Sequence, residues 1–316
     1  MDVKAARSRP ARKRVEQPKL RAVFARPDGS VLDLPGIAAA ADGGIVAPAD
    51  DKDFIPLPKG SLLLTLPGRS VTGFPSTGAA RVFEEHEGEE ICGVAAALPL
   101  GYTRVLLPAY VERAGAPALP LYGYTAVAWS DSGFRVAAVR TDELESWSPQ
   151  THEDEQVREG IALRSLEFPR NILVQQLATC ATEYGCFTAQ NLFLRQGEAA
   201  LPVSPACNAR CIGCISEQEP DAQVKSAQER IRRRPTLEEI SDLAVAHLRT
   251  VKKGMISFGQ GCEGEPLLAA PLIAQAIRRV RESVHSGIIH CNTNASSPKA
   301  LSELIDAGLQ SIRISL

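Results

Sequence analysis

The segment Ala199-Ala-Leu-Pro-Val-Ser-Pro-Ala-Cys-Asn-Ala-Arg-Cys-Ile-Gly-Cys214 joins a short apolar run to three closely spaced cysteines. The CxxxCxxC spacing places Cys207, Cys211 and Cys214 on one loop, where three thiolates can converge on one metal centre. The chain has only eight cysteines in 316 residues, so chance is a poor explanation for the triplet. A four-iron cluster held by three thiolates keeps one iron open to a non-protein ligand. The loop therefore predicts a metal centre, for which an iron–sulfur cluster is one candidate.

A structural zinc site with three cysteines and one histidine is the alternative for this loop. None of the five histidines lies near the triplet in sequence, although one can approach it in the folded chain. Cysteine spacing alone leaves iron–sulfur and zinc both open.

The residues after the triplet alternate between strand and helix patterns. Thr236-Leu-Glu-Glu239 is a capping box that starts one helix, Pro271 starts a second, and Ser297-Pro298 starts a third that stops at Gly308. The expected strands cover residues 199–204, 255–258, 288–291 and 311–316. Such β–α units predict a parallel sheet or barrel, with functional residues at the carboxyl ends of the strands.

Each expected strand is followed by residues suited to a binding site. The cysteines follow the first strand, Gly264 and Glu265 follow the second, and Asn292 and Asn294 follow the third, while Ser315 ends the fourth. Each short motif alone is also typical of an ordinary turn or solvated loop. At the mouth of a parallel barrel they converge on one cavity.

At these residues the chain from about Ala199 to Leu316 resembles the first two-thirds of a radical S-adenosylmethionine (radical SAM) enzyme. The resemblance implies an α/β fold with four of the six β–α units of the family's barrel. It implies that Cys207, Cys211 and Cys214 bind a 4Fe–4S cluster whose fourth iron is chelated by S-adenosylmethionine. Reductive cleavage of that cofactor gives methionine and a 5′-deoxyadenosyl radical, which attacks a substrate.

Further residues carry the resemblance. Gly264-Glu265-Pro266 is similar to the end of the family's GGEP motif, which implies that the backbone at Gly264 and the Glu265 carboxylate receive the methionyl ammonium. Asn292-Thr-Asn294 lies where relatives carry Thr-Asn-Gly, and residues 308–315 resemble the segment that gives a cofactor-contacting serine, here Ser315. This last stretch is most like the molybdenum-cofactor-synthesis cyclase and peptide-modifying branches.

Two positions depart from the family pattern. Relatives usually place an aromatic residue before the third cysteine to pack near the adenine, and this chain has Gly213 there. The first glycine of GGEP is Glu263, which we expect to put an extra carboxylate beside the cofactor site.

The residues before the triplet predict three further segments. Residues 1–24 are basic and predict a disordered tail, with a nucleic-acid or partner contact as the alternative. Residues 25–140 predict a small β-rich domain of unassigned role, with strands at 61–66 and 124–129. Residues 141–197 predict a linker and a helical segment, with a helix over 170–182. The barrel part is then 198–316.

Composition narrows the partners. The net charge of −2 creates no global field that favours nucleic acid or an anionic membrane. The sequence has no run of eighteen apolar residues, so we expect no membrane-spanning helix. The N-terminus lacks an apolar signal region, so the cytoplasm is the expected location. The resemblance implies an electron donor such as a flavodoxin or ferredoxin, and an unidentified small-molecule or peptide substrate.

Other features stay open. Cys180, Cys186, Cys262 and Cys291 are either a second cluster site or small apolar core residues. The basic run at 230–234 is either a solvated connector or a phosphate site. A chain that stops on a buried strand exposes an unpaired edge, which predicts a truncated or incomplete sequence. Two alternatives to a radical SAM enzyme therefore stay open. The chain is a non-catalytic regulatory protein that binds zinc or an iron–sulfur cluster, or it is an inactive fragment of a radical SAM enzyme.

Overall fold

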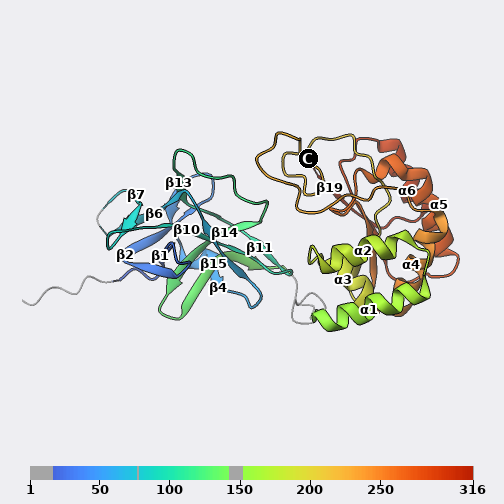
Figure 1. Cartoon of the computed structure of the whole chain (residues 1–316), viewed down its shortest axis with the longest axis horizontal. Coiled ribbons are helices and arrows are strands. Elements are labelled where there is room, and N and C mark those ends of the chain that lie inside the picture. Colours follow the sequence, from blue (N-terminus) through green and yellow to red (C-terminus); the bar gives the residue numbers. More distant parts are fainter. Residues whose placement is uncertain (1–16, 77, 142–151, 316) are drawn as a thin grey trace, which may run out of the picture. The chain divides into compact units, whose positions relative to one another are not determined.

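The computed structural model describes residues 17–76, 78–141 and 152–315 (Figure 1). The chain divides into two compact units. Unit 1 comprises Met1–Pro117 and Tyr122–Glu143, and unit 2 comprises Ala118–Leu121 and Leu144–Leu316. The described part of unit 1 contains strands and one 3-10 helix, whereas unit 2 combines helices with a parallel sheet. The expected order, a β-rich domain followed by an α/β region, is confirmed.

Unit 1 is an antiparallel sheet centred on β1 (Arg21–Ala25), β10 (Cys92–Ala97) and β14 (Tyr124–Ser130). Alternate side chains of β14 enter two different apolar clusters, with Ala126 in one and Val127 in the other. Successive side chains of a strand point to opposite faces, so both faces of the sheet are packed. The strands expected at 61–66 and 124–129 are confirmed as β5 and β14.

The remaining described elements of unit 1 are further strands and one 3-10 helix. They are β2 (Val31–Asp42), β3 (Val46–Pro48), η1 (Asp51–Asp53), β4 (Phe54–Pro56), β5 (Leu62–Leu66), β6 (Arg69–Pro75), β7 (Arg81–Phe83), β8 (Glu85–His86), β9 (Glu89–Glu90), β11 (Tyr102–Arg104), β12 (Leu107–Pro108), β13 (Tyr110–Glu112) and β15 (Gly133–Arg140).

The N-terminal boundary expected at residue 24 is wrong. Strand β1 begins at Arg21, and Leu20, Val23 and Phe24 are buried in the core. Arg21 fits this strand because Asp33 accepts a hydrogen bond from its Nε at 2.6 Å and neutralises the charge. The basic composition therefore hid the first core strand, while residues 1–16 of the expected tail lie outside the described part.

Unit 2 opens with three helices: α1 (Asp154–Glu167), α2 (Ile172–Thr182) and α3 (Phe187–Leu194). The helix expected over 170–182 is confirmed as α2. Asn171 caps it by accepting a hydrogen bond from the backbone N–H of Leu173 at 2.9 Å. The expected linker falls mostly on residues 142–151, outside the described part of the chain.

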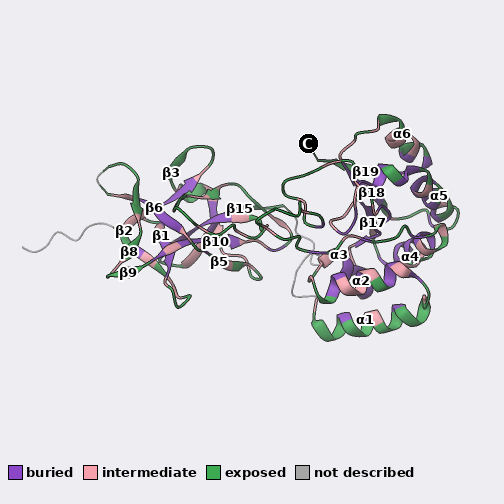
Figure 2. Ribbon diagram, turned by 45° about the horizontal axis from the view of Figure 1, so that its top comes forward, coloured by how far each residue is buried: buried purple, intermediate pink, exposed green. Residues whose placement is uncertain are grey.

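Four parallel strands follow in the order β16 (Glu198–Ala200), β17 (Met255–Phe258), β18 (Ile288–Thr293) and β19 (Ser311–Ile314). The crossover helices α4 (Leu237–Thr250), α5 (Ala270–Arg281) and α6 (Pro298–Ala307) lie side by side along this sheet (Figures 1 and 2). Right-handed crossovers between neighbouring strands place helices on one face. A short 3-10 helix, η4 (Pro266–Ala269), precedes α5.

The helix signals in the sequence act as expected. Both hydrogen bonds of the Thr236–Glu239 capping box form at the start of α4. Ser297 caps α6, and Gly308 ends it with a φ of +113°, a conformation that glycine adopts without steric cost. The apolar stripes of α4 and α5 are buried in the main core of unit 2.

The described part of unit 2 forms an open four-stranded sheet, and no closed barrel is seen in it. The mixed α/β class is thus confirmed. Within the described residues, every helix is also too short or too polar to span a bilayer.

Candidate active site

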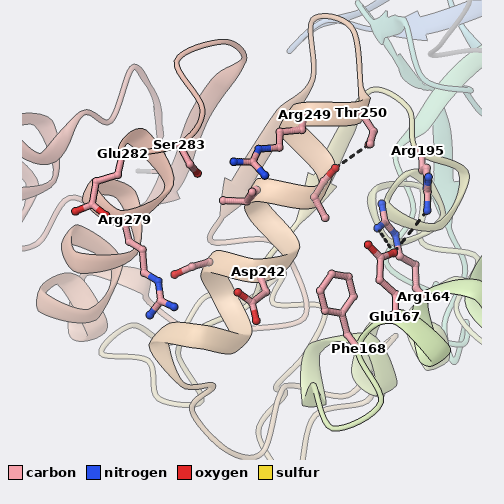
Figure 3. A pocket seen from close by; sticks show the side chains of 13 residues that line it. Arg164, Glu167, Phe168, Arg195, Asp242, Arg249, Thr250, Arg279, Glu282 and Ser283 are labelled. Carbon is pink, nitrogen blue, oxygen red and sulfur yellow. Dashed lines mark hydrogen bonds and ion pairs between the residues drawn. The ribbon is translucent and has the colours of Figure 1, made fainter.

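One cavity of about 590 Å³ lies among α1, α4 and α5 (Figure 3). Its charged side chains are partly paired with one another, since Glu167 binds both Arg164 at 2.6 Å and Arg195 at 3.5 Å. Arg249 and Thr250 in its lining place this cavity near the carboxyl end of α4. Each crossover helix leads into the amino end of the next strand, so the cavity lies towards the amino ends of the strands. Functional groups of β–α folds gather at the opposite edge, so we do not assign the active site to this cavity.

A second cavity, of about 670 Å³, is lined by all three cysteines of the triplet. Its size is typical of small-molecule sites, which span about 300–1,000 Å³. The cysteines belong to the segment 201–236, which contains neither helix nor strand and follows β16 directly. Cys207 and Cys214 are half-buried, and Cys211 is exposed.

The geometry of the cysteine loop fits a cluster in part. The N–H of Cys214 donates to the carbonyl oxygen of Cys211 at 3.0 Å, closing a turn that keeps the two Cα atoms within about 7 Å. Within the described residues, however, no group of three His, Cys, Asp or Glu side chains is arranged to hold a metal ion. The loop therefore supplies three cysteine side chains that line one cavity, which suits a cluster. Their three sulfur atoms do not converge on one point as metal ligands would.

Gly264 lies directly against the start of the cysteine loop. A Cβ atom at this position would be 2.1 Å from the carbonyl oxygen of Ala206 and 2.9 Å from the backbone nitrogen of Cys207. The N–H of Gly264 also donates to Ser204 at 2.7 Å. Only glycine permits this approach, so the loop after β17 sets where the cysteine loop begins.

The Glu265 carboxylate is buried and used within the protein. It accepts hydrogen bonds from Thr293 Oγ1, from the N–H of Asn294 at 2.9 Å and from the N–H of Leu267 at 3.0 Å. Glu265 is 4% exposed. We expected this carboxylate to face a ligand ammonium, and its observed contacts instead join the loop after β17 to the end of β18.

Glu263 also differs from expectation. It is buried, and its carboxylate accepts the N–H groups of Val203 and Ser204, both at 2.8 Å, and of Gly259. The carboxylate that we expected beside the cofactor therefore joins the residues just after β16 to the loop after β17. Burial raises the pKa of Glu263 to about 7, against the lowering effect of the three backbone donors.

This raised pKa predicts a pH-dependent stability. Between pH 4.5 and about 7 the folded protein keeps a proton that the unfolded chain releases, so the free energy of unfolding falls as pH rises. The expected fall is about 3 kcal/mol. Urea unfolding followed by circular dichroism at 222 nm measures it, because the described α-helices all belong to unit 2.

The variant Glu263→Gln cannot titrate, so its unfolding free energy should lack this fall. Glu229→Gln is the matched control, since the side chain of Glu229 is 63% exposed. The assignment to Glu263 is wrong if Glu263→Gln and the unchanged protein show the same slope with pH.

The cysteine loop is also tied to the loop after β18. Asn208, between the first two cysteines, accepts from Asn294 Nδ2 at 2.8 Å and donates through its own Nδ2 to Ser296 Oγ at 2.8 Å. Asn294 thus lies beside the cysteine loop, as expected. Asn208 was not singled out from the sequence, because nothing in the loop distinguishes it from a solvated asparagine.

The other expected site residues lie in different surroundings. Asn292 is inside β18 rather than in a loop, and its Nδ2 donates to the carbonyl oxygen of Phe258 at 3.4 Å. Ser315 is exposed, with its N–H donating to Thr293 at 3.0 Å. A Cβ atom at Gly213 would meet no atom within 4 Å, and the neighbouring Ile212 is 96% exposed. The structure therefore gathers Gly264, Glu265 and Asn294 at the cysteine loop.

Cys214 has a cation beside its sulfur. Arg230 Nη2 donates to Cys214 Sγ at 3.7 Å, and Arg230 Nε donates to Ser216 Oγ at 3.3 Å. The Arg230 side chain is only 12% exposed and is held by an ion pair with Glu217. Burial raises the pKa of the Cys214 thiol, but hydrogen bonds from Ser216 and Glu217 and the charge of Arg230 outweigh it and lower the pKa.

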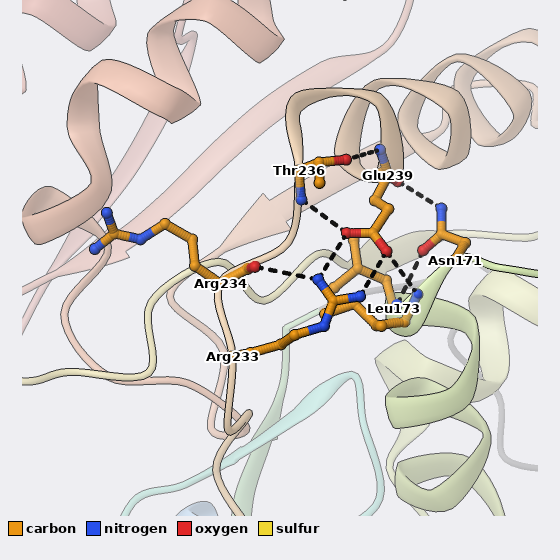
Figure 4. A network of polar contacts seen from close by, with 7 residues as sticks. Asn171, Leu173, Arg233, Arg234, Thr236 and Glu239 are labelled. Carbon is orange, nitrogen blue, oxygen red and sulfur yellow. Dashed lines mark hydrogen bonds and ion pairs between the residues drawn. The ribbon is translucent and has the colours of Figure 1, made fainter.

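Arg233 of the basic run joins two helix starts. Arg233 donates to both carboxylate oxygens of Glu239, at 3.0 and 3.4 Å (Figure 4). The same carboxylate accepts the N–H groups of Thr236 at 2.7 Å and of Ile172 at 3.1 Å, which joins the starts of α4 and α2. The members of the run therefore differ, since Arg230 and Arg233 are held by ion pairs with Glu217 and Glu239 whereas Arg234 is exposed. No local pattern in the sequence indicates this difference.

The remaining cysteines of unit 2 are mainly core residues. Cys180, Cys262 and Cys291 belong to the hydrophobic core, and Cys291 lies on β18 rather than in a loop. The hydrogen bond with Cys180 and burial together raise the pKa of the Cys262 thiol, which favours the neutral form of Cys262. Within the described residues they form no metal-binding group. These observations favour the core interpretation over a second cluster.

A row of polar side chains crosses the parallel sheet. Ser257, His290 and Ser311 are aligned in register on adjacent strands, and His290 Nδ1 lies 2.9 Å from Ser311 Oγ. Ser257 Oγ donates to Glu198 on β16. The alternation of polar and apolar residues in 288–293 and 311–315 was the available signal for this polar face.

Comparison with protein-family models, with curated proteins and with solved structures gave no match for this chain. The resemblance seen in the sequence therefore stays an expectation.

Proposed function

We propose that this protein is a radical SAM enzyme whose cysteine loop holds a 4Fe–4S cluster. The observation that best supports the proposal is the meeting of three motif-bearing segments. Gly264 packs on Ala206 and Cys207, and Asn208 binds Asn294, so segments far apart in sequence adjoin at the carboxyl ends of the strands. An isolated zinc loop does not require the Gly-Glu-Pro and Asn-Thr-Asn segments beside it.

In this proposal Cys207, Cys211 and Cys214 are the cluster ligands, and the open sheet is the first part of a (β/α) barrel. When bound, the cluster and S-adenosylmethionine supply the electron transfer and the adenosyl radical chemistry. Gly264 and Glu265 hold the strand-end loops in place around that site. The cavity of about 670 Å³ gives the ligand room beside the cysteines.

The reacting substrate would lie against the polar face beside His290 and Ser311, which are both partly exposed. Hydrogen-bonding groups on two adjacent strands suit a polar small molecule or peptide. The proposal also includes a flavodoxin-like or ferredoxin-like electron donor and a cytoplasmic location.

Anaerobic reconstitution with iron and sulfide tests the proposal. We expect a brown protein with about four irons per chain that, after reduction with dithionite, converts S-adenosylmethionine to methionine and 5′-deoxyadenosine. Chromatography measures both products, and heat-inactivated protein is the control. A colourless protein that binds one zinc per chain and releases neither product would contradict the enzyme and favour the zinc alternative.

A further inference from the structure

Arg230 stands out among the residues lining the cysteine cavity. It is 16 residues beyond the third cysteine in sequence, and its guanidinium reaches the sulfur of Cys214 at 3.7 Å. Three contacts fix it: the sulfur itself, the Ser216 hydroxyl at 3.3 Å and the Glu217 carboxylate. The side chain is 12% exposed, so burial holds the guanidinium in this position.

The loop geometry supports the same contact from the other side. Gln218 Nε2 donates to the carbonyl oxygens of Cys214 and of Ile212, the latter at 3.2 Å. The N–H of Gln228 donates to the carbonyl oxygen of Ile215 at 3.0 Å, which brings the chain back past the cysteine loop two residues before Arg230. The backbone of Cys214 and the approach of Arg230 are therefore both fixed by hydrogen bonds.

We propose that Arg230 is a positioning residue that directs the Cys214 sulfur and, through its N–H group, raises the reduction potential of the centre bound there. This inference rests on the proposed cluster. Reduction adds negative charge to a cluster and its thiolates, and a cation that hydrogen-bonds a ligand sulfur stabilises the reduced form more than the oxidised one. Arginine suits this position because it stays charged and offers several donors in a fixed plane.

The first test is a redox titration of the reconstituted protein, followed by the electron paramagnetic resonance signal of the reduced cluster. Arg230→Gln should lower the midpoint potential. Arg230→Lys keeps the charge but not the planar fork, so its midpoint potential should lie between those of Arg230→Gln and the unchanged protein. Arg232→Gln is the matched control, because Arg232 is 83% exposed and forms an ion pair with the nearby Glu229. Equal midpoints for Arg230→Gln and the unchanged protein would overturn the inference.

A second measurement separates this inference from the proposed function. In the metal-free protein, iodoacetamide modification of Cys214 at one fixed pH is followed by peptide mass spectrometry, with the exposed Cys211 as internal reference. Because the guanidinium contacts the Cys214 sulfur, its loss should change the ratio of Cys214 to Cys211 modification in Arg230→Gln and leave that ratio unchanged in Arg232→Gln. An unchanged ratio in Arg230→Gln would refute the contact, even if no cluster assembles. A normal cluster with unchanged potentials would refute only the role of Arg230.

Discussion

Alanine at Cys207, Cys211 or Cys214 is expected to reduce bound iron from about four per chain to near zero, and to abolish S-adenosylmethionine cleavage. Three thiolates are the fewest that hold a four-iron cluster while leaving one iron open, and two cannot retain it against solvent. All three side chains line one cavity, so each substitution removes a ligand from the same site. Iron analysis and product chromatography on the reconstituted variants measure the two effects.

The matched control is Cys92→Ala. Cys92 lies on β10 of unit 1 and is half-buried, so its removal should leave iron content and cleavage unchanged. Cys180→Ala extends the comparison to the core thiols, and unchanged iron there would argue against a second cluster. Iron near four per chain in any one variant of the triplet would contradict the assignment of that cysteine as a ligand.

Much of the fold of unit 2 could be predicted because its signals are local. The Thr236–Glu239 capping box, the Ser297 cap and Gly308 each act within one helical turn, and α4 and α6 form where these residues indicate. The first strand of unit 1 was missed for the opposite reason. From the sequence, Arg21 belongs to a basic tail. In the folded chain its charge is neutralised by Asp33, twelve residues away.

The candidate site was only partly predictable, because its decisive contacts join distant residues. The sequence identified Glu263 and Glu265 as carboxylates near a ligand, but their oxygens are directed to Val203, Ser204 and Thr293 by the tertiary fold. Burial of an unpaired carboxylate is costly, and backbone N–H groups relieve that cost. No local sequence pattern predicts which strand end will supply the backbone N–H groups that bind each carboxylate.

Gly264→Ala is expected to have the second large effect, a loss of about 3 kcal/mol in the free energy of unfolding together with much weaker iron binding. The added Cβ would lie 2.1 Å from the carbonyl oxygen and 2.4 Å from the carbonyl carbon of Ala206. Both are backbone atoms, so no side-chain rotation can relieve the overlap. The chain must move apart, which shifts Cys207 and breaks the hydrogen bond from the N–H of Glu265 to Ala206 at 2.9 Å.

Gly213→Ala provides the control within the same cavity segment. Its Cβ would meet no atom within 4 Å, and its backbone is not in the left-handed region, so the unfolding free energy should change by less than about 0.5 kcal/mol. Urea unfolding followed at 222 nm and iron content after reconstitution compare the two variants. Equal stability and equal iron in both would show that the approach of Gly264 to Ala206 does not position the cysteine loop. A loss confined to Gly264→Ala would tie cluster binding to the packing of two loops that lie more than fifty residues apart in sequence.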